Sequence, residues 1–227
     1  MAEAGNPTDI KSRLRDSYNA IAPTYNKWTA SHHAVRMTYL AKALAYLDPS
    51  QRSKDLAFLE LGCGCGQPVT EKLFSYPNAT VFANDISDTQ LALVRDNLLR
   101  EQSDGATRRL NLIPGDMNSL EFDAGSFDLV AAFYSVMHLP RDEQLELLER
   151  VARWLKPGGY LVANFAVEDK ESEVIEKWLG DDGWMYWSGW GNEKNLQKIK
   201  DVGLDVVLSE ETTAAVPASF LWVIAKR

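Results

Sequence analysis

Apolar and polar positions follow a helical period near the amino terminus of the chain. In residues 10–26 and again in residues 34–47, apolar side chains recur every three or four positions, which predicts two helices with one buried face each. The Asp-Pro-Ser sequence at residues 48–50 ends the second segment, because proline cannot continue a helix. We expect these helices to form a cap over the first strand, after a frayed segment at residues 1–9. The buried stripe of the second helix consists of Tyr39, Leu40, Ala43, Leu44 and Leu47.

From residue 57 onward, short apolar runs alternate with segments of helical period. The run at residues 127–134 is continuous, which is typical of a strand buried on both faces. Such alternation predicts an α/β fold with a mostly parallel sheet of seven strands, covered by helices on both faces. The strands are expected at residues 57–61, 80–84, 110–114, 127–134, 160–166, 204–208 and 219–225. The helices between them are expected to begin near Pro68, to be capped by Ser87, and to cover residues 142–155 and 193–202.

Residues 168–191 interrupt the alternation with acids, glycines and tryptophans. At 227 residues, the chain has a usual length for one domain. We therefore expect a single domain over residues 1–227, with a helical cap at residues 1–50 and an α/β core at residues 55–227 that contains the insert.

Composition and charge limit the partners of this chain. Hydrophobic residues make up 45% of the sequence, as in ordinary globular proteins. The net charge of −8 disfavours nucleic acid as a partner, because phosphate binding requires a basic face. No apolar run approaches the length needed to cross a membrane, and the polar start has no signal-peptide core. We expect a cytoplasmic protein with no membrane partner.

The cysteines and histidines predict no metal site. Cys63 and Cys65 are two positions apart, which fits neither a redox pair nor half of a zinc site, so we expect small thiols packed in a tight loop. The three histidines are scattered and offer no ligand spacing.

A glycine-rich turn follows the first predicted strand. Glycines stand at every second position there, at Gly62, Gly64 and Gly66. Such glycines let the backbone bend sharply and leave no side chain between it and a ligand. Asp85 follows where the next strand ends, and a carboxylate there can accept both hydroxyl hydrogens of a ribose. The turn and the carboxylate together predict a cofactor that contains a nucleoside.

The order of residues around the turn favours one kind of nucleoside. A dinucleotide fingerprint has its last glycine where this chain has Gln67. Glu60 stands just before the turn, and its negative charge would oppose a pyrophosphate but would suit a sulfonium or an α-amino group. The turn therefore favours a cationic nucleoside that carries an amino acid over a nicotinamide dinucleotide.

The turn at residues 60–66 resembles motif I of the class I S-adenosylmethionine-dependent methyltransferases. Further segments resemble elements of the same family in the same order, and an ordered set is more specific than any one of its members. Residues 18–25, with two tyrosines, resemble the stretch that covers the cofactor in the small-molecule branch. The ordered segments are Asp85 after the second strand, Gly115-Asp116-Met117, Phe127-Asp128-Leu129-Val130, residues 135–139 and residues 155–159.

The resemblance implies a Rossmann-like fold whose last strand is antiparallel, with S-adenosylmethionine as the cofactor. It also implies transfer of a methyl group to a small organic molecule by in-line SN2 displacement, in which the protein positions and desolvates the acceptor. By the same resemblance, Asp85 would bind the ribose and Asp116 the adenine amino group. The implied cofactor-binding residues are Tyr18, Tyr25, Glu60, Gly62, Gly64, Gly66, Asp85, Ile86, Asp116, Met117 and Tyr134.

Some of these residues also have a purely structural interpretation. Ile86 and Met117 would either contact the adenine or pack in the hydrophobic core. Tyr18 and Tyr25 also fit a helix stripe of aromatic residues. For Arg36, a solvated surface position is favoured over contact with the carboxylate of the cofactor.

His138 and an aromatic cluster are the candidates for acceptor chemistry. His138 lies just past the fourth expected strand, where it would help to remove a proton or orient the acceptor. A histidine that packs the following helix is the competing interpretation. Aromatic walls suit a flat or apolar acceptor or a cationic amine, whereas a small core under a long loop would use the same residues. The substrate-binding residues expected in the insert are Trp184, Tyr186, Trp187 and Trp190.

Other functions are compatible with parts of this pattern. A protein of the same fold could bind the cofactor without methylating, as a regulatory subunit or as an enzyme of a non-methylating rearrangement, and it would then yield no S-adenosylhomocysteine. A nicotinamide oxidoreductase is a third alternative, which Glu60 and Gln67 disfavour. Residues 133–136 lack the Asn/Asp-Pro-Pro-Tyr/Phe run of adenine-N6 nucleic-acid methyltransferases, which together with the acidic charge argues against nucleic acid.

Overall fold

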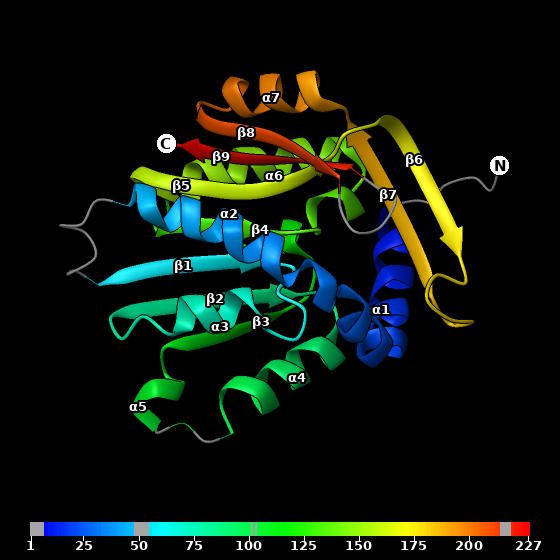
Figure 1. Ribbon diagram of the computed structural model, residues 1–227, viewed down its shortest axis with the longest axis horizontal. Helices are drawn as coiled ribbons and strands as arrows, with labels where there is room; N and C mark the ends of the chain where they lie inside the picture. Colours follow the sequence, from blue (N-terminus) through cyan, green and yellow to red (C-terminus); the bar gives the residue numbers. More distant parts are fainter. Residues whose placement is uncertain (1–6, 48–54, 101, 103, 214–218) are drawn as a thin grey trace.

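The computed structural model describes residues 7–47, 55–100, 102, 104–213 and 219–227. A seven-stranded sheet with the strand order β3-β2-β1-β4-β5-β9-β8 forms its centre (Figure 1). The strands are β1 Leu56–Leu61, β2 Ala79–Asp85, β3 Leu110–Pro114, β4 Phe127–Ala132, β5 Leu155–Ala166, β8 Asp205–Thr213 and β9 Ser219–Lys226.

The strand directions confirm the predicted sheet. β1, β2, β3, β4 and β5 pair in parallel, and β9 runs antiparallel to both β5 and β8. Every residue of β4 is buried, as the continuous apolar run predicts. The order reverses between β1 and β4, and ligands of open α/β sheets bind beyond the carboxyl ends of the strands at such a point.

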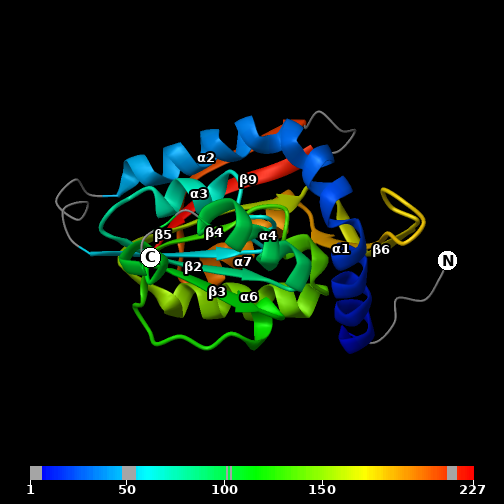
Figure 2. The same cartoon turned by 90° about the horizontal axis from the view of Figure 1, so that it is seen from below.

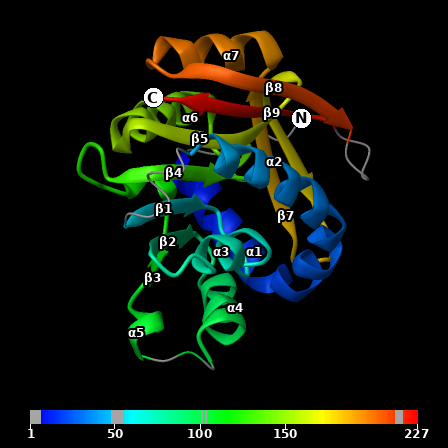
Figure 3. The same ribbon diagram turned by 60° about the vertical axis from the view of Figure 1, so that its left-hand side comes forward.

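Helices cover both faces of the sheet, and two separate cores fill the space between (Figure 2). Side chains from α2, α3 and α4 join the core on one face, and side chains from α6 and α7 join the core on the other. Figure 3 shows α7 beside the β8 edge and α4 and α5 at the β3 edge. The helices are α1 Pro7–Thr29, α2 His33–Tyr46, α3 Val69–Phe74, α4 Asp88–Leu98, α5 Asp104–Thr107, α6 Arg141–Trp154 and α7 Asn192–Asp201, with short 3₁₀ turns η1 Ala30–His32, η2 Met117–Ser119 and η3 Val136–His138.

The local signals read from the sequence explain where these helices begin. Ser87 is the N-cap of α4 and its hydroxyl accepts a hydrogen bond from the backbone N–H of Gln90 at 3.1 Å. Pro68 directly precedes α3, as expected. The five stripe residues of α2 are all buried against the sheet.

Two elements stand across the carboxyl edge of the parallel strands, and both differ from the prediction (Figure 1). The first is α1, which begins at Pro7, so residues 7–9 are helical rather than frayed; residues 1–6 and 48–50 lie outside the described residues. The second is an antiparallel hairpin of β6 Asp169–Glu176 and β7 Trp184–Trp190, where a loop-like insert was expected. Strand pairing also begins earlier in β5 and continues further in β8 than predicted, because these residues pair with β4 and β9.

None of the helices in the described part of the chain is both long and apolar enough to span a membrane.

Candidate functional site

The glycines of the turn after β1 differ in what surrounds them. All three have positive φ angles, of 75° at Gly62, 56° at Gly64 and 83° at Gly66. A Cβ atom on Gly62 would lie 2.5 Å from Cβ of Ser135, and one on Gly66 would lie 3.1–3.3 Å from side chains of α4. A Cβ atom on Gly64 would meet nothing within 4 Å. Gly62 and Gly66 therefore permit close packing, and Gly64 faces open space.

Asp85 holds this turn at the end of β2. One carboxylate oxygen accepts a hydrogen bond from the Gly64 N–H at 2.8 Å, and the other accepts one from the Ser87 N–H at 2.9 Å. The side chain is 8% exposed, and burial raises the pKa of the Asp85 carboxyl to about 6. The carboxylate is thus fixed beside the open space at Gly64.

One pocket, here called the cofactor pocket, gathers most of the predicted cofactor residues. It lies at the carboxyl ends of β1, β2 and β4 under α1. The sequence-predicted residues that line it are Tyr18, Tyr25, Gly62, Gly64, Asp85, Ile86, Asp116, Met117, Tyr134 and His138. Gly66 does not line it, because its turn position packs against α4.

Lys11 adds an unpredicted charge to this pocket. Its ammonium lies 2.6 Å from a carboxylate oxygen of Asp116 and 2.6 Å from one of Glu143, so it bridges α1 to the segments after β3 and in α6. The other oxygen of Asp116 accepts a hydrogen bond from the Asn118 N–H at 3.0 Å. Asp116 therefore reaches the pocket while it is tied to α1.

A polar recess continues from the glycine turn and contains Glu60 and Arg36. Glu60 accepts a hydrogen bond from the hydroxyl of Thr70, and burial raises its pKa to about 8. Arg36 is 8% exposed, so the expected solvated position is wrong. One of its Nη atoms donates to Thr29 Oγ1 at 2.8 Å, and its Nε has no hydrogen-bond partner among the described residues.

A buried hydrogen-bonded chain joins α1 to the segment after β4. The Nδ1 atom of His138 lies 2.9 Å from the carbonyl oxygen of Tyr186, which can only accept, so Nδ1 carries the proton. Burial lowers the pKa of His138 to about 4, so the ring is neutral at pH 7. Its Nε2 therefore accepts the hydrogen bond from the Tyr18 hydroxyl at 2.9 Å.

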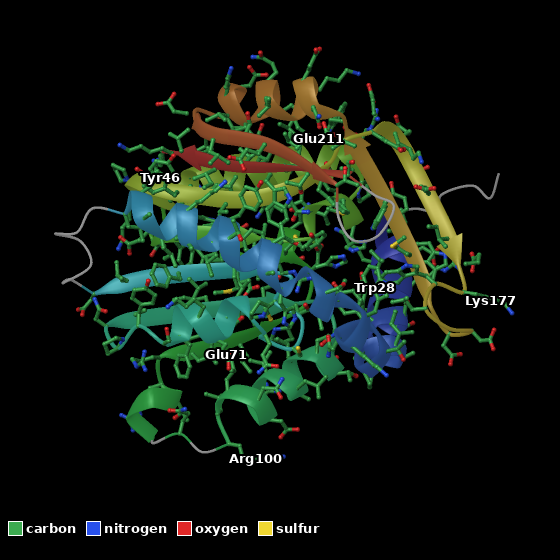
Figure 4. All side chains as sticks on the ribbon, viewed as in Figure 1. Trp28, Tyr46, Glu71, Arg100, Lys177 and Glu211 are labelled. Carbon is green, nitrogen blue, oxygen red and sulfur yellow. The ribbon has the colours of Figure 1, made fainter. Side chains whose placement is uncertain are left out.

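A second pocket, here called the aromatic pocket, shares Tyr18, Tyr25, Tyr134 and His138 with the cofactor pocket. Tyr134 has a φ angle of 56°, and its N–H donates to Asn164 Oδ1 at 2.7 Å, which fixes a backbone conformation that non-glycine residues rarely adopt. Figure 4 shows Trp28 at the end of α1 and Lys177 at the turn of the hairpin. The remaining lining residues are Trp28, Thr29, His32, Met137, Ile175, Trp178, Met185, Trp187 and Phe220.

The predicted substrate residues of the hairpin divide between the two faces of β7. Trp187 lines the aromatic pocket together with Met185. Trp184 and Tyr186 pack against Ile10 and Leu14 of α1 instead, because side chains of a strand alternate between faces. These two side chains therefore lie in a small hydrophobic core between β7 and α1.

Trp190 lies outside both pockets. The guanidinium of Arg141 lies 4.7 Å from the centre of its ring and the ammonium of Lys198 3.8 Å from it. Trp190 therefore packs against α6 and α7 at the end of β7.

Most residues that line the cofactor pocket lie within one segment that a family model matches. The model of the family described as "Methyltransferase domain" matches residues 58–159, which contain the glycine turn, Asp85, Asp116 and His138. Residues 58–159 thus form a methyltransferase domain of the class I S-adenosylmethionine-dependent type. This family has the fold that binds S-adenosylmethionine and S-adenosylhomocysteine.

One curated protein similar to this methyltransferase is the demethylmenaquinone methyltransferase of Lactococcus lactis, which is 27% identical over 157 residues. The match covers 67% of this chain and 58% of that protein. The chain spans about half the length of the curated relatives it matches.

Two solved structures share the fold of this methyltransferase. The 1,6-didemethyltoxoflavin-N1-methyltransferase of Burkholderia thailandensis has a TM-score of 0.72 at 16% identity, and the match covers 100% of this chain and 92% of that one. The [4+2]-cyclase SpnF has a TM-score of 0.69 at 16% identity, and the match covers 94% of each chain.

The residues of the cofactor pocket and the polar recess fit S-adenosylmethionine. Gly64 leaves open space beside the fixed carboxylate of Asp85. The recess on the other side of the turn offers an acid, Glu60, and the unpartnered Nε of Arg36, which suit the amino and carboxylate groups of an amino acid. The chain thus offers polar groups both in the cofactor pocket and in the recess.

Several site residues were missed by the sequence analysis, although three of them left a signal. Arg36 precedes Tyr39 and Leu40 by helical spacing, so it stands on the buried stripe of α2. Trp28 and His32 are four positions apart, which continues the apolar period of α1. Trp178 lies outside the aromatic cluster at residues 183–190, and no periodicity marks it.

Proposed function

We propose that this methyltransferase transfers the methyl group of S-adenosylmethionine to a small organic acceptor, as a single domain. The observation that carries the proposal is the meeting of two pockets at Tyr18 and His138. One pocket holds the glycine turn and Asp85, and the other is lined by aromatic side chains and contains no Asp, Glu, Lys or Arg among its described lining residues. Such a pair suits a nucleoside cofactor on one side and a small acceptor on the other.

We assign the cofactor contacts by the chemistry of each side chain. Asp85 would accept hydrogen bonds from the ribose hydroxyls, and Asp116 one from the adenine amino group, while Ile86 and Met117 flank the ring. In the recess, Glu60 would receive the α-amino group and Arg36 the carboxylate of the methionine part. Tyr18 and Tyr25 would cover the cofactor from α1.

The chemistry divides between the cofactor and the chain. Bound S-adenosylmethionine supplies a methyl group that its sulfonium has already activated for in-line displacement. The chain positions the acceptor and takes its proton. The acceptor would give its proton to the Tyr18 oxygen while the Tyr18 proton moves to Nε2 of His138. His138 is neutral at pH 7 because burial lowers its pKa to about 4, so Nε2 is free to receive that proton.

Two relatives support a small acceptor. The names of the Lactococcus and Burkholderia proteins refer to demethylmenaquinone and didemethyltoxoflavin, which are small molecules. The net charge of −8 supports the same class over a nucleic acid. A cytoplasmic location stays a prediction.

A second candidate is a protein that uses the same fold without methylating. The similarity to a [4+2]-cyclase supports this candidate, because the name of that protein describes a ring-forming reaction and its structure has the same fold. It differs from the first in one product, since it would form no S-adenosylhomocysteine.

The test is an incubation with S-adenosylmethionine carrying a labelled methyl group. One set of reactions contains mixtures of small hydroxylated and amine-bearing aromatic compounds, and another contains total RNA. We expect S-adenosylhomocysteine and label in the small-molecule fraction only. Label in RNA alone would contradict the acceptor class. Cofactor binding with no S-adenosylhomocysteine in any mixture would favour the non-methylating candidate.

A further inference from the structure

His32 is a buried histidine on the wall of the aromatic pocket. It ends η1, is 2% exposed, and lines the aromatic pocket. Neither Nδ1 nor Nε2 has a hydrogen-bond partner among the described residues. The ring is held by its neighbours alone: it stacks on Tyr134 at 5.3 Å between ring centres, with its edge against Trp28 at 5.1 Å.

Two further polar atoms of the same pocket are equally unpartnered in the described part of the chain. They are the hydroxyl of Tyr134 and Nε1 of Trp187. A buried polar group without a hydrogen bond is destabilising, so three side chains with such groups on one pocket indicate a ligand that satisfies them. Most buried polar groups in proteins do have a partner, which makes this cluster unusual.

The charge of the pocket selects the class of that ligand. Burial and the neighbouring Arg36 lower the pKa of His32, so its ring is neutral and offers one N–H donor and one lone pair. The guanidinium of Arg36 lies 4.9 Å from the ring centre of Tyr134, and its positive charge disfavours a cation in the aromatic pocket. Since the described lining includes no charged side chain, an anion would have no direct partner either.

The shape of the pocket adds a limit on size. Its walls are mostly ring faces and edges, from Trp28, Tyr134, Trp178, Trp187 and Phe220. The cavity is about 280 Å³, at the lower end of the range for small-molecule sites. A flat ligand of one or two fused rings suits these dimensions.

We propose that the acceptor of this methyltransferase is an uncharged planar ring compound that carries a hydroxyl or ring N–H group, and that His32 is its hydrogen-bonding anchor. The inference rests on the proposed function, because it takes the aromatic pocket as the acceptor site. It goes further in selecting a neutral hydrogen-bonding acceptor over the cationic amine and the purely apolar molecule that aromatic walls alone would also accommodate.

The test measures binding of four matched probes to the full chain saturated with S-adenosylhomocysteine. The probes are 2-naphthol, naphthalene, 2-naphthoate and trimethyl(2-naphthyl)ammonium, and calorimetry or equilibrium dialysis gives each dissociation constant. We expect 2-naphthol to bind at least about fivefold more tightly than each of the other three, because it alone is uncharged and can form a hydrogen bond in the buried site. His32→Phe keeps the stacking ring and removes both nitrogens, so it should reduce the preference for 2-naphthol over naphthalene to about twofold or less.

His33→Phe is the matched control, because His33 is the adjacent histidine and lines neither pocket. It should leave the preference for 2-naphthol unchanged. A preference that survives His32→Phe would overturn the role of His32, and tighter binding of either charged probe would overturn the neutral class. Binding of S-adenosylhomocysteine without binding of any of the four probes would also overturn the neutral class. Failure to bind S-adenosylhomocysteine itself, measured before any probe is added, would instead count against the proposed function.

Discussion

The hydroxyl of Tyr18 donates a hydrogen bond of 2.9 Å to Nε2 of His138, although 120 positions separate the two residues. Tyr18 comes from α1, and His138 ends η3 after β4. The same imidazole donates from Nδ1 to the backbone of the hairpin at Tyr186. One ring therefore joins the helix, the sheet and the hairpin at the boundary between the cofactor pocket and the aromatic pocket.

This arrangement predicts the protonation state of His138. The ring should be neutral at pH 7 with its proton on Nδ1, and it should stay neutral until the pH falls to about 4. Nitrogen NMR of ¹⁵N-histidine-labelled protein distinguishes the two tautomers directly. In Tyr18→Phe the Nε2 resonance should shift toward that of a nitrogen without a donor. Labelled-methyl transfer to any acceptor that the screen identifies should fall about tenfold or more, with little change in cofactor affinity. A proton on Nε2, or unchanged transfer in Tyr18→Phe, would contradict the proton path.

Arg36→Met tests the polar recess. The substitution keeps an apolar stem of similar length and removes the guanidinium that we assign to the carboxylate of the cofactor. S-adenosylhomocysteine should bind about ten- to a hundredfold more weakly, the range for a hydrogen bond to a charged group. 5′-Methylthioadenosine lacks the amino-acid part, so its dissociation constant serves as the control and should stay within about threefold. Equal losses for both ligands would mean that Arg36 acts through the fold.

The carboxyl of Asp85 predicts a pH dependence of cofactor binding. Burial raises its folded pKa to about 6 from an ordinary 3.8. Ribose hydroxyls donate to the ionised form, so affinity for S-adenosylhomocysteine should fall about fivefold as the pH drops from 6 to 5. Asp85→Asn should bind more weakly at pH 7 and show a flat profile in this window. If Asp85→Asn shows the same pH dependence of affinity, a group other than Asp85 titrates in this window.

Linkage gives the opposite sign for the stability of the unliganded protein. A carboxyl whose folded pKa is raised contributes stability that is fully present below pH 3.8 and is lost as the pH rises through about 6. The free energy of unfolding in urea should therefore decrease for the wild type, relative to that of Asp85→Asn, as the pH rises from 4 to 6. A constant difference over this window would contradict the raised pKa.

The two faces of β7 predict different effects for two tryptophans of one cluster. Trp184→Ala should lower the free energy of unfolding by about 3–5 kcal/mol, because this buried ring packs on Ile10 and Leu14 of α1. Trp187→Ala should instead weaken binding of the naphthol probe at least about fivefold and cost less stability, because Trp187 lines the aromatic pocket and is only half-buried. Urea unfolding and probe binding measured on both variants check the contrast. The reverse pattern would contradict the assignment of the faces.

The fold could be predicted from the sequence because its signals are local. The continuous apolar run of β4, the stripe of α2 and the cap at Ser87 each act within a few residues of their position. The cofactor pocket also follows from local signals, since the glycine turn and Asp85 both lie at the ends of predicted parallel strands.

The rest of the site depends on contacts between distant segments. Lys11 meets Asp116 across 105 positions, and no local pattern encodes that pairing. The hairpin was missed because a dense aromatic cluster hides the period of two that divides Trp184 from Trp187. The spacing of four from Trp28 marks His32 as inward-facing, but its stacking on Tyr134 joins η1 to the segment after β4, and no local pattern encodes that contact.

The most direct test of the account is a calorimetric titration of the wild type and Asp85→Ala with S-adenosylmethionine, S-adenosylhomocysteine and NAD. We expect micromolar binding of both adenosyl ligands at one site, no binding of NAD, and a loss of about 1.5–3 kcal/mol in the variant. Absence of adenosyl binding, or binding that does not depend on Asp85, would contradict the assignment of the glycine turn and Asp85 to the cofactor.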